Sequence, residues 1–268
     1  MTAPVLESFT SDVGQGEEGD YPVLTKPANV ATGDLLLIFV CNDDTFSNNQ
    51  TVTPSGFTLL QHVGDSTRDC HALVFYRIAD GTEASTVTVE IPDNDEGVAW
   101  YLRVSGADTT TPFGSSIITD LGVSNQLNMG GLGRDDESES QLGFVLCAFD
   151  GGDSDMGLIA PSSWDNYNSD RATSNSALAS AGRYLEEHSS GSSSSGAWST
   201  RTKSGSGGFG LVKWAFAVFD GAVGIGFTVN PAAGGTFQGK LGDLTVSKMY
   251  LGDTEVTGGY LGDIDLWA

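Results

Sequence analysis

The acidic stretch Asp150-Gly-Gly-Asp-Ser-Asp155 contains the residues best suited to binding a metal ion. Asp150, Asp153 and Asp155 place three carboxylates close together, and the glycines between them permit a tight loop. Carboxylate oxygens are the ligands that Ca²⁺ prefers, so Ca²⁺ is the only cofactor with candidate residues. The stretch lacks the complete D-x-[DN]-x-[DN]-G-x₅-E pattern of a calcium loop, and an ordinary solvated loop explains it more simply.

Two aromatic residues, Tyr167 and Trp198, lie among small polar residues in the second half of the chain. Aromatic rings pack against the apolar face of a sugar ring, while neighbouring Asp or Asn side chains bond its hydroxyls. Tyr167 and Trp198 are therefore candidates for contact with a glycan. Trp164 stands nearby, but it aligns with Phe57 in the repeat described below, which favours a core position.

Residues for nucleophilic or acid–base catalysis do not form a recognisable set. The three histidines, His62, His71 and His188, are not accompanied by the G-x-S-x-G turn of a serine hydrolase. A glycosidase needs two carboxylates at a set separation, but a chain with 35 acidic residues always contains such a pair. We therefore expect no catalytic site and no enzymatic activity.

The strongly acidic composition argues against several classes of partner. With 35 acidic and 12 basic residues the formal net charge is −23, which repels nucleic-acid phosphates and anionic membranes. No apolar run approaches the roughly 20 residues of a membrane helix. The N-terminus has no basic segment followed by an apolar core. We expect no nucleic-acid binding, no membrane insertion and no export signal.

The three cysteines, Cys41, Cys70 and Cys147, have no C-x-x-C spacing and are odd in number. A disulfide framework or a zinc site is therefore not expected. Cys41 and Cys147 lie inside apolar segments, where a free cysteine packs like a small hydrophobic residue. We interpret them as buried, reduced thiols.

The elements that must position these residues are predicted to be β-strands. Leu35–Cys41 is a continuous apolar run bounded by turn residues, which is typical of a strand buried on both faces. Thr86–Ile91 alternates apolar and polar residues, as a half-solvated strand does. Strand starts recur every 8 to 12 residues or so, a spacing typical of a sandwich or jelly roll. The fold class is therefore all-β.

The chain contains the same β unit twice. Gly33–Asp44 and the turn that follows it return in weaker form as Leu142–Asp150 and its following turn. Gly208–Phe219 is predicted to be the closing strand of the second copy, and Trp214–Ala222 matches the pattern of Trp100–Asp108. The matched positions are Cys41 with Cys147, Pro54 with Pro161, and Phe57 with Trp164. We predict two tandem jelly-roll-like sandwich units, residues 1–108 and 109–222.

Residues 223–268 are predicted to form a Gly/Ala-rich linker and a repeat tail. Leu-Gly-Asp recurs with a strict ten-residue period, and each copy offers one short strand and one Gly-Asp turn. So short a repeat cannot bury its own apolar face, so it must stack on its neighbours, on the sandwich or on other subunits. The residues assigned to assembly are Leu241, Asp243, Leu251, Asp253, Leu261 and Asp263.

These motifs resemble those of virion structural proteins of tailed bacteriophages with a doubled β-sandwich. In the first unit the resemblance rests on Thr53-Pro-Ser-Gly-Phe57 and Val74-Phe-Tyr-Arg-Ile-Ala79, and in the second on Ala160-Pro-Ser-Ser-Trp164. Met249-Tyr-Leu-Gly-Asp-Thr-Glu-Val256 is similar to the YLGDTEV-type repeats at the ends of many such proteins. The second unit departs from the pattern at Ser163, where glycine is expected.

The resemblance implies a structural role in a virion, and it implies no catalytic residues. It leads us to expect a tail fibre or tail-tip component that contributes to host attachment, forms a homo-oligomer, and contacts other virion proteins and a host surface glycan. A capsid decoration protein or head fibre is the alternative within this class. A polysaccharide-degrading enzyme and a free carbohydrate-binding module are alternatives from other classes.

Overall fold

The described part of the chain consists of strands and turns, without a helix. The computed structural model describes residues 3–15, 21–42, 51–65, 70–91, 96–115, 117–121, 126–129, 141–150, 165–171, 194–203, 212–215, 221–232, 240–241, 244–245, 260–261 and 264–265. All pairings between strands are antiparallel. The all-β class predicted from the sequence is therefore confirmed for these residues.

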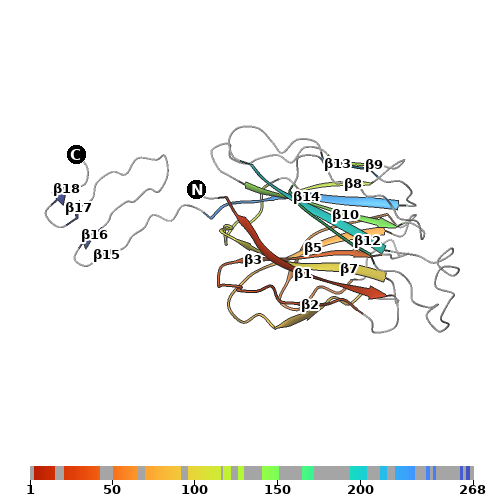
Figure 1. Ribbon diagram of the computed structural model, residues 1–268, viewed down its shortest axis with the longest axis horizontal. Coiled ribbons are helices and arrows are strands. Elements are labelled where there is room, and N and C mark those ends of the chain that lie inside the picture. Colours follow the sequence, from red (N-terminus) through yellow and green to blue (C-terminus); the bar gives the residue numbers. More distant parts are fainter. Residues whose placement is uncertain are drawn as a thin grey trace. The chain divides into compact units, whose positions relative to one another are not determined.

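The first half of the chain forms one five-stranded sheet and one two-stranded sheet. The larger sheet has the order β1-β7-β3-β5-β4, and β2 pairs with β6 in the smaller one. Figure 1 labels β1, β2, β3, β5 and β7 of these strands. The strands are β1 (Val5–Gln15), β2 (Val23–Thr25), β3 (Leu35–Asn42), β4 (Thr58–Asp65), β5 (Cys70–Ile78), β6 (Thr86–Thr88) and β7 (Glu96–Ser105).

The second half repeats this arrangement strand for strand. Its larger sheet, read from the same end, has the order β8-β14-β10-β12-β11, and β9 pairs with β13. The strands are β8 (Ile118–Leu121), β9 (Gln126–Met129), β10 (Gln141–Asp150), β11 (Asp165–Arg171), β12 (Ser194–Lys203), β13 (Val212–Ala215) and β14 (Gly221–Val229). Each strand of the first half therefore has a counterpart seven strands later, with the same neighbours.

The pairing within each half is nested. β1 pairs with β7, β2 with β6 and β3 with β5, so the first half folds back on itself around β4. In the second half β8 pairs with β14, β9 with β13 and β10 with β12, around β11. The described strands of the two halves therefore share one connection pattern.

The two five-stranded sheets share one hydrophobic core. Phe39 of β3 packs edge-on against Phe144 of β10 and Phe227 of β14, at ring centroid distances of 5.6 and 6.1 Å. Burial of the apolar side chains on both sheets stabilises the fold by about 25 cal/mol for each Å² removed from water. Residues 2–231 accordingly form one compact unit.

Strand β3 is buried on both faces, as its continuous apolar run predicted. Leu35, Leu37, Phe39 and Cys41 belong to the core between the two large sheets. Leu36, Ile38 and Val40 belong to a second cluster on the opposite face, which also includes Leu24 and Val89 near the β2–β6 sheet. Because successive side chains of a strand point to opposite faces, β3 serves both clusters at once.

The register of the repeat differs by one residue from the match of Cys41 with Cys147. Leu35, Leu37, Phe39 and Cys41 face the shared core from β3, and Leu142, Phe144, Leu146 and Ala148 do so from β10. Facing positions therefore match Leu35 with Leu142 and Cys41 with Ala148, the same offset that aligns Pro54 with Pro161. The identity of the two cysteines misplaced the match, because it ignored which face of the strand each occupies.

The closing strand of the second half is β14, and not the predicted segment before it. Trp214 lies in β13, which pairs with β9, whereas Gly221–Val229 pairs with β10 as β7 pairs with β3. Residues 223–229 are therefore strand rather than linker, and the second sheet extends past the boundary predicted at residue 222. Glycine-rich composition hid the strand, although its apolar residues alternate strictly: Val223, Ile225, Phe227 and Val229 all lie in the core.

The C-terminal residues 232–268, grouped with Met1, form a separate unit. Two short hairpins are described in it, β15 (Lys240–Leu241) with β16 (Leu244–Thr245) and β17 (Tyr260–Leu261) with β18 (Ile264–Asp265). Leu241 pairs with Leu244, and Leu261 with Ile264, so each pair brackets one Gly-Asp of the sequence repeat. The first and third copies therefore each have two two-residue strands around Gly-Asp, where one short strand per copy was predicted.

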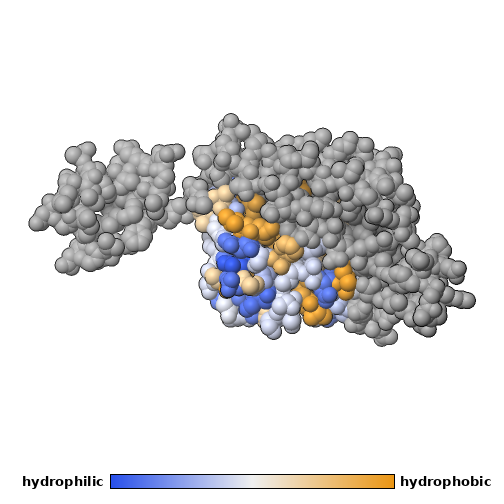
Figure 2. All heavy atoms as spheres, in the orientation of Figure 1, coloured by the Kyte–Doolittle hydropathy of each residue, from blue (hydrophilic) through white to orange (hydrophobic). Residues whose placement is uncertain are grey.

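The described surface is mixed in character. Figure 2 shows hydrophilic residues gathered over much of its visible part, with smaller hydrophobic patches beside them. The large apolar side chains that remain exposed among the described residues are Val5, Phe9, Val23, Val52 and Leu59. Scattered exposed apolar residues are normal for a folded protein and do not by themselves indicate an interface.

Replacing Phe39 by alanine should destabilise the protein strongly, because the ring joins both sheets of the shared core. We expect Phe39→Ala to lower the free energy of unfolding by about 3–5 kcal/mol, measured by chemical denaturation followed by tryptophan fluorescence. Phe9→Ala on β1 is the matched control, since Phe9 is 38% exposed. Equal losses for the two variants would contradict the shared core.

Candidate functional site

A pocket of about 480 Å³ opens on the face of the first sheet that points away from the shared core. Tyr101 of β7 and Phe57 lie at its wall, and both belong to the second hydrophobic cluster. The remaining walls come from the turn at residues 52–56, from Arg77 at the end of β5, from residues 82–84, and from β6 with Glu90 beyond it.

The turn at Pro54–Phe57 requires glycine at position 56. The Phe57 N–H donates to the Pro54 carbonyl at 3.0 Å, and Gly56 has a φ of 80°, a region that other residues rarely adopt. A Cβ at position 56 would also lie only 2.7 Å from Nη1 of Arg77. The missing side chain therefore lets the guanidinium pack directly against the turn.

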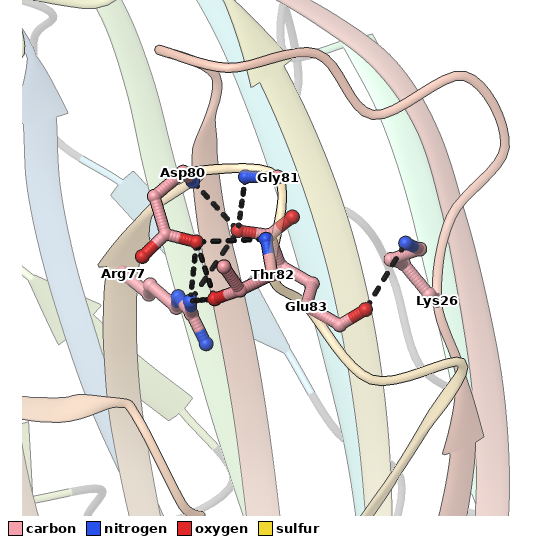
Figure 3. A network of polar contacts seen from close by, with 6 residues as sticks. All are labelled: Lys26, Arg77, Asp80, Gly81, Thr82 and Glu83. Carbon is pink, nitrogen blue, oxygen red and sulfur yellow. Dashed lines mark hydrogen bonds and ion pairs between the residues drawn. The ribbon is translucent and has the colours of Figure 1, made fainter.

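Arg77 is held by the loop that follows β5 (Figure 3). Its Nη2 donates to Oδ1 of Asp80 and to Oγ1 of Thr82, each at 2.8 Å. The Thr82 hydroxyl and the Thr82 N–H also donate to Oδ1 of Asp80, at 2.6 and 2.8 Å. Oδ1 of Asp80 thus accepts three hydrogen bonds, which hold the Arg77 side chain and the loop backbone together.

Glu83 completes this network from within the wall of the pocket. Its side chain is only 3% exposed and its Oε1 lies 3.5 Å from Nη2 of Arg77. The same oxygen accepts the N–H groups of Asp80 and Gly81, at 2.7 and 3.3 Å. Lys26 donates from Nζ to the Glu83 carbonyl at 3.3 Å, which ties the loop to the segment after β2. The charge of Arg77 is therefore balanced by acidic groups of its own loop.

Tyr101 has a buried hydroxyl without a hydrogen-bond partner among the described residues. The residue is 0% exposed, and it packs edge-on against Phe57 at a ring centroid distance of 5.7 Å. Burial, reinforced by the negative charge of Glu83, raises the pKa of Tyr101 to about 12, so the hydroxyl keeps its proton. A buried hydroxyl left unpaired costs about 1–3 kcal/mol of stability.

The predicted calcium residues are only partly within the described chain. Asp150 is the last residue of β10, whereas Asp153 and Asp155 lie outside the described residues. No group of three or more His, Cys, Asp or Glu side chains that could hold a metal occurs in the part of the chain that the structure describes. The Ca²⁺ site at residues 150–155 stays a prediction.

The predicted glycan-contact residues lie on neighbouring strands. Tyr167 is in β11, where the register shifts between Asp165 and Asn168, and Trp198 of β12 pairs with Asn168 and with Leu146. The structure does not describe their side chains. Trp198 pairs with Leu146, and Leu146 corresponds to Phe39 of the first half. Because Phe39 pairs with Val74, Trp198 corresponds in register to Val74.

Among the predicted assembly residues, the structure describes Leu241 in β15 and Leu261 in β17. The others, Asp243, Leu251, Asp253 and Asp263, lie outside the described residues. Their role in assembly stays a prediction.

Two of the three histidines form a pair that the sequence did not reveal. Nε2 of His62 lies 2.8 Å from Nδ1 of His71, the rings stack at a centroid distance of 5.1 Å, and His71 is buried. The pair packs against Gly64, where a Cβ would collide with the His71 ring. His188 lies outside the described residues.

The three cysteines are buried and form no disulfide, which confirms the interpretation of Cys41 and Cys147 as reduced core thiols. The Cys41 thiol donates to the Cys147 carbonyl at 3.4 Å. Burial raises the pKa of both thiols well above their usual value, which keeps them protonated. A thiol in this state is a poor nucleophile.

Comparison of the chain with protein-family models, with curated proteins and with solved structures gave no match. Within the described part of the chain, no helix is long and apolar enough to cross a membrane.

The residues of the pocket were not predicted as a site, although two of the quoted motifs contribute to it. Thr53–Phe57 forms its turn, and Val74–Ala79 supplies Arg77. Two features of the sequence pointed to this site: Gly56 after Pro-Ser, and Arg77 as a lone arginine at the end of an apolar strand. Neither signal indicates that Tyr101, distant in the sequence, lies beside them.

Asp80 should titrate unusually low. Hydrogen bonds from Thr82, with a smaller contribution from the charge of Arg77, lower the pKa of Asp80 from 3.8 to about 2. The carboxylate is therefore favoured by folding: its contribution to stability is present above about pH 4 and is lost as the pH falls towards 2. We expect the ¹³C resonance of the Asp80 carboxylate to remain that of the ionised form at about pH 3.

Thr82→Val provides the matched comparison, because it removes the hydroxyl donor and retains the shape of the side chain. In this variant the Asp80 resonance should move towards that of the protonated form at the same pH. A wild-type Asp80 that is already largely protonated at about pH 3 would contradict the network in Figure 3.

Proposed function

We propose that the chain is a virion structural protein of a tailed bacteriophage, built from two jelly-roll-like units and an assembly tail. The nested strand pairing supports the jelly-roll-like assignment, because such folds arise when a long hairpin rolls up on itself. The repeated strand order supports two units that are copies of each other. Their larger sheets pack against one another, which accounts for a single compact body at residues 2–231.

The observation that carries the structural role is the tail of short hairpins. Pairs of two-residue strands contain too few contacts to be stable alone, since an isolated hairpin is marginal even with longer strands. Hairpins that recur with the sequence repeat therefore need a surface against which to pack. Other copies of the chain, or neighbouring virion proteins, supply that surface in this proposal.

Within the particle we propose a tail fibre or tail-tip position and a contribution to host adsorption. A homo-oligomer presents many identical surfaces, so contacts that are individually weak add up to firm attachment. The acidic composition suits a soluble body that does not adhere to nucleic acid. In the alternative, a capsid decoration protein or head fibre, residues 232–268 would bind the protein to the capsid instead of the phage tail. Labelling the tail with a gold cluster and imaging intact particles distinguishes these positions.

Removing residues 232–268 should abolish self-association while leaving the sandwich folded. The truncated chain retains the shared core, so we expect an unchanged β-sheet circular dichroism spectrum and a monomer by sedimentation velocity. The full chain should sediment as an oligomer.

Leu241→Asp combined with Leu261→Asp tests the same surface without truncation. Both leucines lie at paired positions of the hairpins, and an introduced carboxylate there is costly to bury. Two further carboxylates at Ser247 and Thr257, between the Leu-Gly-Asp copies, serve as the charge-matched control. A monomeric full-length chain, or equal effects of the two double variants, would refute the assembly role.

A further inference from the structure

One edge of the β2–β6 sheet is not covered by any other described strand. Strand β6 pairs with β2 alone, and its other side borders the pocket of about 480 Å³. The Ser85 carbonyl and the Val89 N–H, on either side of β6, bond towards β2 at 2.9 Å each. In an antiparallel ladder the residues at alternate positions direct their N–H and C=O groups to the opposite side. The main-chain groups of Thr86 and Thr88 therefore face the pocket.

The hydrogen bond next to these threonines shows that this side of the chain already forms sheet-like pairing. The Val52 N–H donates to the Glu90 carbonyl at 3.0 Å, at the next alternate position after Thr88. The N–H and C=O groups of Thr86 and Thr88 have no partner among the described residues, and both threonines are exposed. We call these groups the open edge of β6.

An open edge of this kind binds an extended peptide by strand addition, through main-chain hydrogen bonds that a segment without proline can form. A two-stranded sheet is marginally stable by itself, whereas a sheet of three or more strands with an apolar face is stable. The open edge of β6 therefore suits a strand that also lacks a second neighbour.

The first hairpin of residues 232–268 contains such a strand. Among the described residues β16 pairs with β15 alone. Addition of β16 to β6 joins two two-stranded sheets into one sheet with the order β15-β16-β6-β2. In an extended chain that begins with β16, Leu244, Val246 and Lys248 share one face, and Thr245 and Ser247 share the other.

Charge favours the first copy of the tail repeat over the other two. Arg77 and Glu83 in the pocket wall balance each other, so the exposed Glu90 leaves the wall negative. Leu244–Lys248 carries one lysine and no acidic residue. The corresponding five residues of the second and third copies each carry one acidic residue and no basic residue, so this wall repels them.

We propose that the segment Leu244–Lys248 of one copy adds as a strand to the open edge of β6 in a neighbouring copy. Leu244, Val246 and Lys248 then face the pocket, and Ser247 faces solvent. The inference rests on the proposed assembly role, and it names the surface that receives the tail. The hairpins can also pack against one another, so the assembly role stands if this contact fails.

Photo-crosslinking of the full-length protein tests the contact. Ser247→Cys is alkylated with benzophenone maleimide, which spares the native thiols because they are buried. The alkylated ¹⁴N chain is mixed with unmodified ¹⁵N chain by dilution and reconcentration, and native mass spectrometry confirms that the subunits have exchanged. We expect crosslinks from the ¹⁴N tail to residues 52–56 and 84–90 of the ¹⁵N chain, identified by peptide mass.

Two changes in the ¹⁵N chain test whether the contact is made by the main chain. Thr88→Pro removes an N–H of the open edge and none that bonds to β2, so the crosslink yield should fall about fivefold. Thr88→Val is the matched control, since it alters the side chain and retains the N–H. The crosslink yield of this control should equal that of wild type.

A charge exchange gives a second test that introduces no proline. Glu90→Lys in the ¹⁵N chain should lower the crosslink yield about threefold, the effect of one exposed ion pair. Lys248→Glu in the alkylated chain should restore the yield with Glu90→Lys, because the two charges have then exchanged places.

Sedimentation velocity separates failure of this contact from failure of the assembly role. An oligomer without ¹⁴N–¹⁵N crosslinks at residues 52–56 and 84–90 overturns the contact and leaves the assembly role intact. Crosslinks confined to ¹⁴N chains overturn it as well, because they assign the open edge to the tail of the same copy. Equal yields for Thr88→Pro and Thr88→Val exclude strand addition, and a monomeric full-length chain refutes both proposals.

Discussion

The burial of β3 on both faces is the constraint on which the rest of the structure depends. Its odd-numbered residues from Leu35 to Cys41 enter the core between the large sheets, and its even-numbered residues enter the cluster on the opposite face. Because the side chains alternate, a slip of one residue would exchange the two sets. The flanking strands β5 and β7 are bound to β3 along its whole length, so they inherit this register.

The sequence was sufficient to predict this strand, because its residue types and its length both favour a strand. A run of seven apolar residues between turn residues is too short for most helices, and β10 has a similar run. The register of the duplication was harder to predict, since matching identical residues gives Cys41 with Cys147. Only the faces of the two strands reveal the correct match, and a face is a property of the folded sheet.

The closing strand β14 was missed for a different reason: its glycine-rich composition is typical of a linker, although it forms a strand. Its glycines at positions 221, 224 and 226 resemble a linker, whereas its buried apolar residues alternate with a period of two. Alternation is the physically meaningful signal, because a glycine on the other face does not interrupt it. The pocket was beyond prediction for a related reason: Tyr101 joins Phe57 and Arg77 only through the order of strands in the sheet.

The same strand correspondence shows where the two halves of the molecule differ in sequence on their outer faces. Arg77 pairs with Leu36, and Arg201 pairs with Gly143, the counterpart of Leu36, so an arginine is present at this position in both halves. Tyr101, however, pairs with Ile38, and its counterpart opposite Val145 is Gly226, which has no hydroxyl.

The sequence at the position of the turn that supports Arg77 differs as well. Ser163 stands in the sequence where Gly56 provides its positive φ in the first half, and serine rarely adopts that conformation. The inner face of each unit is committed to the shared core, so it must stay apolar in both. The outer face carries no such obligation, so a residue that lines the pocket in the first half, such as Tyr101, need not recur in the second. Sheets that share one core therefore leave most sequence variation to their outer faces.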